Sequence, residues 1–151
     1  MPCAPGTYNP ASNQSACWPC DAGYYCPDTN MTTPVICPIG SYCPSNSSQP
    51  QKCPAGTYGI GQGLGNVSAC TPCDPGHYCD TNGLTAPVGE CDAGFYCSSG
   101  SPIRAPTAFY AANGNICPPG SYCPVGSPGP LPCPAGTYSA SYQLSSDAQV
   151  C

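Results

Sequence analysis

The chain has very little charge. Only nine of its 151 residues are charged, of which two, Lys52 and Arg104, are basic, and His77 is its one histidine. Two basic side chains cannot neutralise a phosphate backbone, so the composition excludes nucleic-acid binding. Nor does any apolar run approach the eighteen or so residues that a transmembrane helix needs, so we expect no membrane span in this segment.

Large apolar side chains are also scarce, with one Trp and two Phe in the whole chain. A core of this kind is too small to offset a chain entropy of about 1–2 kcal/mol per residue. The chain has instead 16 Cys, 22 Pro and 18 Gly. This cysteine content predicts a disulfide scaffold rather than a disordered chain, and it places the protein in an oxidising compartment. We therefore expect an extracellular or cell-surface location.

The pattern Cys-x-x-Gly-x-Tyr organises the sequence and occurs eight times. Its copies open at Cys3, Cys20, Cys37, Cys53, Cys73, Cys91, Cys117 and Cys133. In five copies the Tyr is followed at once by a second cysteine, namely Cys26, Cys43, Cys79, Cys97 and Cys123. In the other three copies the second cysteine comes later, at Cys17, Cys70 and Cys151. We call these five short-loop and three long-loop repeats, and together they use all sixteen cysteines.

The order of the repeats suggests three blocks. Residues 3–52 hold one long-loop and two short-loop repeats, 53–132 hold one long-loop and three short-loop repeats, and 133–151 begin a third block. Glycine supplies the positive φ of a tight turn, and no window has helical periodicity. Units this small must stack on their neighbours. The predicted fold is small and disulfide-rich: an elongated tandem-repeat rod of short β-hairpins and turns with essentially no helix.

The ends of the long loops differ. The first two run into the next motif as Cys17-Trp-Pro-Cys20 and Cys70-Thr-Pro-Cys73, whereas the third stops at Cys151. We therefore expect a further x-Pro-Cys to follow and the sequence to be a segment of a longer repeat protein. A short secreted protein numbered after cleavage is the alternative.

Three pairing rules suit a repeat of variable copy number. Each repeat closes on itself (Cys20–Cys26), or each links to the next (Cys26–Cys37), or neighbouring short-loop repeats cross (Cys20–Cys37 with Cys26–Cys43). The linking rule sends Cys3 and Cys151 outside the segment, and the crossed rule leaves one short-loop repeat over in a run of three. Long loops that close on themselves are favoured, while the short-loop pairing stays open.

The stretch Cys53-Pro-Ala-Gly-Thr-Tyr58 to Cys70-Thr-Pro-Cys73, followed by Gly76-His-Tyr-Cys79 and Cys91-Asp-Ala-Gly-Phe-Tyr-Cys97, resembles ephrin-receptor-like cysteine-rich repeats. The long-loop repeat is also similar to the first module of tumour necrosis factor receptor cysteine-rich domains. That resemblance implies the pairs Cys3–Cys17, Cys53–Cys70 and Cys133–Cys151. Ephrin-receptor-like repeats occur in large extracellular proteins and in proteins of flagellar hairs, which implies a structural role.

Four sequons for N-glycosylation occur, at Asn13, Asn30, Asn46 and Asn66. Asn13 and Asn66 share one place, four residues before the closing cysteine of a long loop. Because the chain is expected outside the cell, we predict covalent glycans at these sites. Glycans would also explain how a surface with so few charges stays soluble.

No pattern favours catalysis. Cys17-Trp-Pro-Cys20 has the spacing of a redox motif, but it recurs at Cys70–Cys73 as a repeat junction without a thioredoxin-like βαβ pattern. Four thiolates suit zinc, yet cysteines in register beside sequons favour disulfides. His77 occupies a variable place in the motif and is interpreted as a surface residue. We predict no enzyme activity, no cofactor and no metal.

The remaining candidates are contact residues. Trp18 is expected to cover a disulfide at a junction or, if exposed, to contact another subunit. The irregular insertion Ser101–Asn115 carries Ile103, Phe109 and Tyr110, which are candidates for a partner contact. Our leading hypothesis is a glycosylated rod in an extracellular filament, flagellar hair or surface coat that contacts copies of itself. The alternative is a cysteine-rich receptor or adhesion ectodomain that binds a protein ligand.

Overall fold

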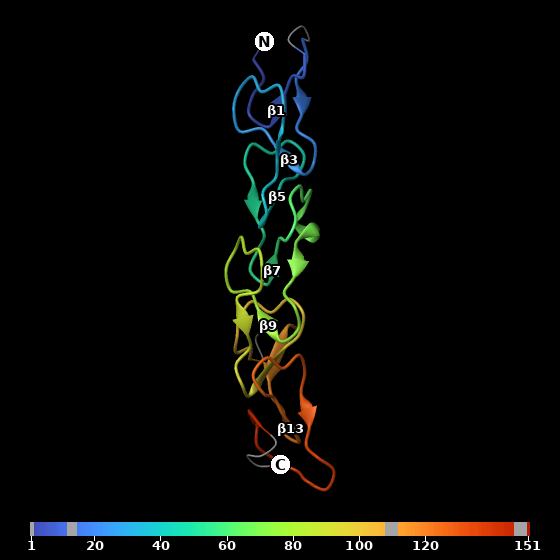
Figure 1. Cartoon of the computed structure of the whole chain (residues 1–151), viewed down its shortest axis with the longest axis vertical. Coiled ribbons are helices and arrows are strands. Elements are labelled where there is room, and N and C mark those ends of the chain that lie inside the picture. Colours follow the sequence, from blue (N-terminus) through green and yellow to red (C-terminus); the bar gives the residue numbers. More distant parts are fainter. Residues whose placement is uncertain (1, 12–14, 108–111, 147–150) are drawn as a thin grey trace. The chain divides into compact units, whose positions relative to one another are not determined.

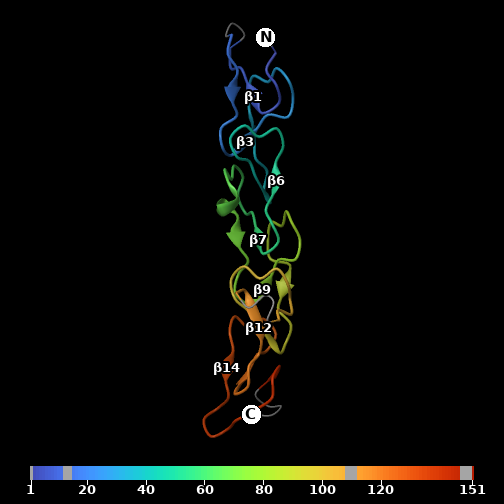
Figure 2. The ribbon, with the colours of Figure 1, turned by 180° about the vertical axis from the view of Figure 1, so that it is seen from behind.

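The structure is a computed structural model that describes residues 2–11, 15–107, 112–146 and 151. It contains two compact units. The first comprises residues 1–54, 58–71 and 82–85, and the second comprises 55–57, 72–81 and 86–151. Within each unit the repeats follow one another in sequence order (Figures 1 and 2). This order is marked in the first unit by strands β1 (Thr7–Tyr8), β3 (Tyr24–Tyr25) and β6 (Gln51–Lys52), and in the second by β9 (His77–Tyr78), β12 (Gly114–Ile116) and β14 (Leu131–Pro132).

Every repeat is closed by its own disulfide. The eight bonds are Cys3–Cys17, Cys20–Cys26, Cys37–Cys43, Cys53–Cys70, Cys73–Cys79, Cys91–Cys97, Cys117–Cys123 and Cys133–Cys151. Their Cα–Cα distances run from 5.5 to 6.3 Å, within the range that a disulfide spans. The structure therefore follows the self-closing rule, and the linking and crossed pairings of the short-loop repeats do not occur. Sixteen paired cysteines indicate an oxidising environment.

A two-stranded antiparallel hairpin joins each repeat to the next. The strand at the motif tyrosine pairs with the strand just before the following motif cysteine. The pairs are β1 (Thr7–Tyr8) with β2 (Trp18–Pro19), β3 (Tyr24–Tyr25) with β4 (Val35–Ile36), β5 (Ser41–Tyr42) with β6 (Gln51–Lys52), β7 (Thr57–Tyr58) with β8 (Thr71–Pro72), β9 (His77–Tyr78) with β10 (Gly89–Glu90), β11 (Phe95–Cys97) with β12 (Gly114–Ile116), and β13 (Ser121–Tyr122) with β14 (Leu131–Pro132). The register is the same in the six pairs other than β7 with β8, for which it is not described: the motif tyrosine lies opposite the residue two before the next motif cysteine, as in Tyr25↔Val35 and Tyr42↔Gln51.

The turn before each motif strand requires glycine. All eight motif glycines have positive φ, between 76° and 91°, which confirms the turn predicted from the motif. In the second repeat this turn is closed by a hydrogen bond that the Tyr24 N–H donates to the Asp21 carbonyl at 3.0 Å. The turn directs the chain straight into strand β3.

The core consists of sulfur rather than of large apolar side chains. Among the described residues, the buried apolar side chains are half-cystines together with Tyr58, Pro106 and Leu144. The one helical element described is a three-residue 3₁₀ turn, η1 (Val67–Ala69), in the second long loop. The predicted class of disulfide-rich hairpin repeats with essentially no helix is confirmed.

The self-closing pairing can be tested with trypsin, because Lys52 and Arg104 are the only two cleavage sites in the sequence. Both side chains are exposed, and no disulfide crosses either site. Digestion of the denatured, unreduced protein should therefore release three separate peptides, 1–52, 53–104 and 105–151, as measured by mass spectrometry. Three peptides that stay joined until reductant is added would contradict this pairing, because the linking rule connects them through Cys43–Cys53 and Cys97–Cys117.

Candidate functional site: the repeat junctions and their surface

The junction between the second and third repeats is made by four backbone hydrogen bonds. Gly23 donates its N–H to the Cys43 carbonyl at 2.7 Å and accepts from the Cys37 N–H at 2.9 Å. The Asn46 N–H donates to the Cys20 carbonyl, and the Cys26 N–H donates to the Ser47 carbonyl, both at 2.9 Å. The second repeat thus presents four polar groups from one disulfide-closed loop, and the third repeat satisfies all of them.

The same four bonds recur at all seven junctions, with lengths of 2.7–3.0 Å. The bonds from the motif glycines illustrate this: Gly6 donates to Cys26, Gly23 to Cys43, Gly40 to Gly59, Gly56 to Cys79, Gly76 to Cys97, Gly94 to Cys123 and Gly120 to Ser139. Gly59 and Ser139 stand in long-loop repeats, where no cysteine follows the motif tyrosine. Long-loop and short-loop repeats therefore make the same junction and differ in where the disulfide closes.

A second series of left-handed residues, which the sequence motif does not contain, completes each junction. These residues follow the motif tyrosine by four or five positions and have φ between 59° and 81°: Asn30, Asn46, Gly63, Gly83, Gly100, Gly126 and Gln143. Each donates its N–H to the first cysteine of the preceding repeat. In five of the seven places this residue and the next one read Asn-Ser, Gly-Leu or Gly-Ser. The series is hard to recognise in the sequence because its distance from the motif tyrosine varies by one residue.

The motif glycines also allow a repeat to contact the repeat that lies two further along the chain. A Cβ added to Gly23 would lie 2.5 Å from the carbonyl oxygen of Gly63, two repeats further along, and one added to Gly40 would lie 2.6 Å from that of Gly83. Real Cβ atoms do not approach an oxygen this closely. The glycines are therefore required twice, for their positive φ and for this close approach.

Asn30 serves both as a sequon asparagine and as a structural clamp. Its Oδ1 accepts from the Cys3 N–H at 3.1 Å, and its own N–H donates to the Cys3 carbonyl at 3.0 Å. The residue is exposed, as is Thr32. Because an N-glycan is attached through Nδ2, the Oδ1 bond is compatible with modification.

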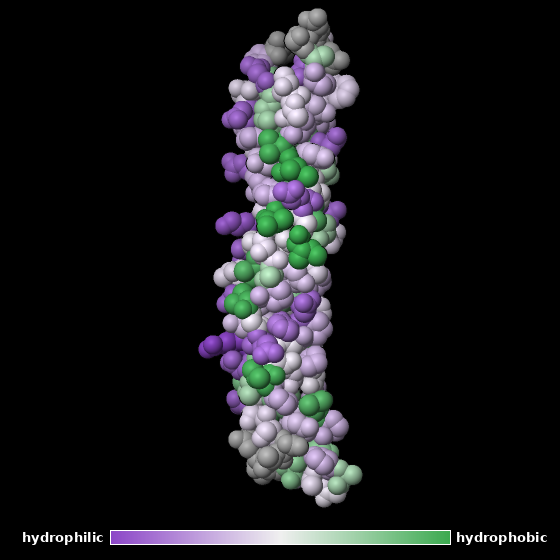
Figure 3. Space-filling view, viewed as in Figure 1, coloured by the Kyte–Doolittle hydropathy of each residue, from purple (hydrophilic) through white to green (hydrophobic). Residues whose placement is uncertain are grey.

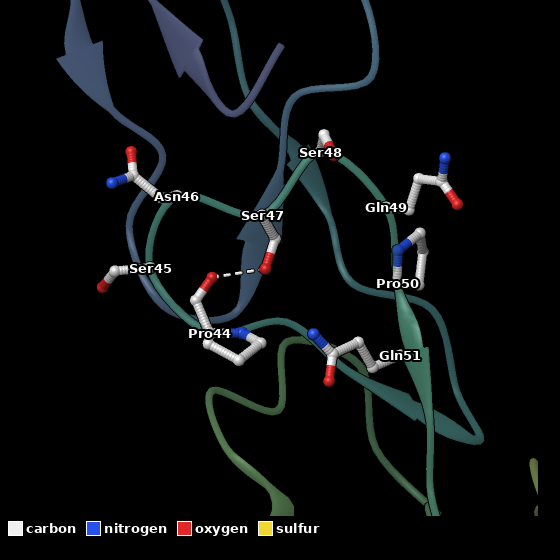
Figure 4. Close-up of a pocket in the computed structure, with 8 residues that line it drawn as sticks. All are labelled: Pro44, Ser45, Asn46, Ser47, Ser48, Gln49, Pro50 and Gln51. Carbon is white, nitrogen blue, oxygen red and sulfur yellow. Dashed lines mark hydrogen bonds between the residues drawn. The ribbon is translucent and has the colours of Figure 1, made fainter.

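The asparagines of the other described sequons, Asn46 and Asn66, are exposed as well. Asn46 lies in the equivalent left-handed place, and its side chain points away from the loop that carries it (Figure 4). Asn66 caps η1, because its Oδ1 accepts from the Ala69 N–H at 3.1 Å. Asn13 lies outside the described residues. Glycosylation at all four sites stays a prediction.

Trp18 is half-exposed, and it packs edge-on against Tyr8 across the β1–β2 hairpin, with ring centroids 6.4 Å apart. In the insertion Ser101–Asn115, Ile103 is partly buried, and its carbonyl accepts from the Ser101 hydroxyl at 2.8 Å. Arg104 ties the insertion to the sixth repeat through an ion pair with Asp92, Nε–Oδ2 3.4 Å. Phe109 and Tyr110 lie outside the described residues.

The described residues hold neither a metal-binding cluster nor a Cys-x-x-Cys redox pair. They contain no cluster of three His, Cys, Asp or Glu side chains that could hold a metal. Cys17 and Cys20 bond to different partners, Cys3 and Cys26, so the Cys-x-x-Cys spacing forms no redox pair. A shallow hollow of about 390 Å³ lies within the loop 44–51, where Ser47 donates to the Pro44 carbonyl (Figure 4). Its lining is uncharged and provides neither an acid nor a base.

Hydrophobic residues come to the surface in small groups among polar ones on the face seen in Figure 3. Three of the exposed apolar side chains, Trp18, Val35 and Leu131, share one place, two residues before a motif cysteine. Others, such as Ile60 and Val125, do not share it. Over the described ranges, no helix has the length and hydropathy needed to cross a bilayer.

No protein-family model matches the chain, and no curated protein matches it.

We predict that Gly23→Ala destabilises the oxidised protein by about 2 kcal/mol, because alanine would need a left-handed backbone and its methyl group would meet the Gly63 carbonyl. This corresponds to a fall in Tm of about 4–8 °C for a chain of this size. The matched control is Gly61→Ala, where an added Cβ meets nothing within 4 Å. Thermal unfolding followed by circular dichroism measures both, and equal Tm values for the two variants would disprove the close-approach role.

For Asn30, Thr32→Ala should remove the glycan and keep the clamp, whereas Asn30→Ala should remove both. We expect each secreted variant to lack one glycan by intact mass. Asn30→Ala should also be less stable than Thr32→Ala by about 1 kcal/mol, because the Cys3 N–H loses its acceptor. If Thr32→Ala lowers the mass only by the difference between the two side chains, Asn30 is not glycosylated. Equal stability of the two variants would argue against the clamp.

Proposed function

We propose that the chain is a structural component of an extracellular filament, flagellar hair or surface coat, in which it acts as a glycosylated, disulfide-stabilised rod. The observation that carries this proposal is that the same four backbone hydrogen bonds form all seven junctions. Each of the first seven repeats offers the same four backbone groups to the repeat that follows it, and the residues of the motif are used in making that contact. A chain that devotes its recurrent residues to stacking is suited to building length.

The surface supports the same role. The three described sequon asparagines are exposed, and an oxidising compartment is where glycans and disulfides occur together. The motif also resembles ephrin-receptor-like repeats, which occur in extracellular fibres. The described residues hold no metal cluster, and the hollow at 44–51 is uncharged, so the proposal assigns no chemistry to the chain.

Contact between copies is proposed at the side chains that recur with the repeat. Trp18, Val35 and Leu131 are exposed apolar residues at equivalent places, so the contact that one of them makes can be repeated by the next. A receptor would instead concentrate its contact at one irregular place. In this chain that place is the insertion Ser101–Asn115 with Ile103.

Light scattering over a concentration series of the secreted glycoprotein tests the proposal. We expect the mass to rise with concentration and filaments to appear by electron microscopy. The triple variant Trp18→Thr, Val35→Thr, Leu131→Thr should weaken association at least tenfold. The control variant Ile60→Thr, Val67→Thr, Val125→Thr removes apolar side chains that are at least as exposed but do not share a place, and it should have little effect.

Three results would overturn the proposal. The first is a monomer at every concentration. The second is equal weakening by the two triple variants. The third is loss of association on Ile103→Ser alone, which would place the contact in the insertion and favour a receptor or adhesion role.

A further inference from the structure

The disulfide connectivity divides the chain into closed loops and the links between them. Because no bond joins two repeats, the shortest covalent path from Cys3 to Cys151 crosses eight disulfides and runs through seven links. These links are 17–20, 26–37, 43–53, 70–73, 79–91, 97–117 and 123–133. A pulling force follows this path and bypasses the residues that each disulfide encloses.

The links are of two kinds. After the first and fourth repeats the link has only two residues between cysteines, Trp18-Pro19 and Thr71-Pro72, and these residues form extended strands. After every short-loop repeat the link has nine to nineteen residues between cysteines. Such a link first turns back, as Asn30 does when it bonds to Cys3 of the preceding repeat, and then runs forward to the next motif cysteine. Only the longer links can therefore lengthen when the chain is pulled.

We infer that the chain has a mechanical function: it is an extensible tether whose reserve lies in the links after short-loop repeats and whose maximum length is set by the disulfides. The four backbone bonds of a junction hold each long link in place. Under tension these bonds break before any covalent bond, so the links straighten and the closed loops stay closed. The first two long-loop repeats are followed by links of two residues, which are already extended and do not lengthen. This inference develops the proposed structural role, because a component of a surface fibre bears load along its chain.

The connectivity fixes the expected lengths. With about 3.5 Å per extended residue, the oxidised chain should reach about 290 Å between Cys3 and Cys151, and the fully reduced chain about 520 Å. Each closed repeat also keeps its turn and cysteines near their native separation, with Cα atoms about 6 Å apart in Cys20–Cys26. We therefore expect the oxidised chain to re-form its junctions on relaxation, because the disulfides restrict the unfolded ensemble.

Single-molecule force spectroscopy on the 151-residue chain, held through tags added at its two ends, tests this inference. The oxidised chain should lengthen in steps to about 290 Å and recover them over repeated cycles, and a dithiol reductant should add about 230 Å. The double variant Cys53→Ala, Cys70→Ala should add about 55 Å to the oxidised limit, and the matched Cys73→Ala, Cys79→Ala only about 15 Å. These limits depend on the covalent path and hold even for a variant that does not fold.

Equal increments for the two double variants, or an oxidised limit near 520 Å, would overturn the inference. A chain that shows no lengthening before rupture, or no recovery on relaxation, would do the same. The measurement is made on one molecule, so it does not depend on self-association. A chain that stays monomeric in solution and still shows the disulfide-set limit would reject the filament proposal and leave this inference intact.

Discussion

The structure depends on a short covalent constraint: a disulfide that holds two points of each repeat about 6 Å apart. The polar groups that meet the next repeat lie on the loop so closed, in Cys20, Gly23 and Cys26 for the second repeat. Ordering these groups by side-chain packing would require a core of large apolar side chains, and the chain has too few of them to form one. The disulfide reduces the entropy cost before stacking begins, and backbone hydrogen bonds then complete the repeat.

The motif was sufficient to predict the repeats, the hairpins and the glycine turns, because these are local features. A glycine three residues after a cysteine and two before a tyrosine takes a positive φ in every copy, and its sequence position reveals it. The pairing of the short loops could not be predicted. Spacing alone is compatible with Cys26 bonding to Cys20 or to Cys37, and the choice depends on how the intervening residues return to the preceding repeat.

The second left-handed series was missed for a related reason. Its members are Asn, Gly and Gln, and their distance from the motif tyrosine varies by one residue, so Asn30 and Asn46 were recognised only as sequons. Their structural role becomes visible when three repeats are considered together, because the carbonyl of Asn46 lies against Gly6 two repeats earlier. The candidate contact residues belong to the surface, where the motif imposes no residue type. The sequence therefore could not predict whether Trp18 is covered or exposed. In the structure one edge of its ring packs against Tyr8 and about half of the side chain stays exposed.

The four bonds that recur at every junction join main-chain groups only, and this has a consequence for how such a chain can change over generations. A junction of this kind does not specify which repeat is its neighbour, since Gly40 bonds to Gly59 of a long-loop repeat as Gly23 bonds to Cys43 of a short-loop one. A whole repeat can therefore be duplicated or deleted, or a long-loop repeat can replace a short-loop one, without a compensating substitution in the adjacent repeat. The length of the chain and the placing of its sequons become quantities that gene rearrangement can adjust one repeat at a time.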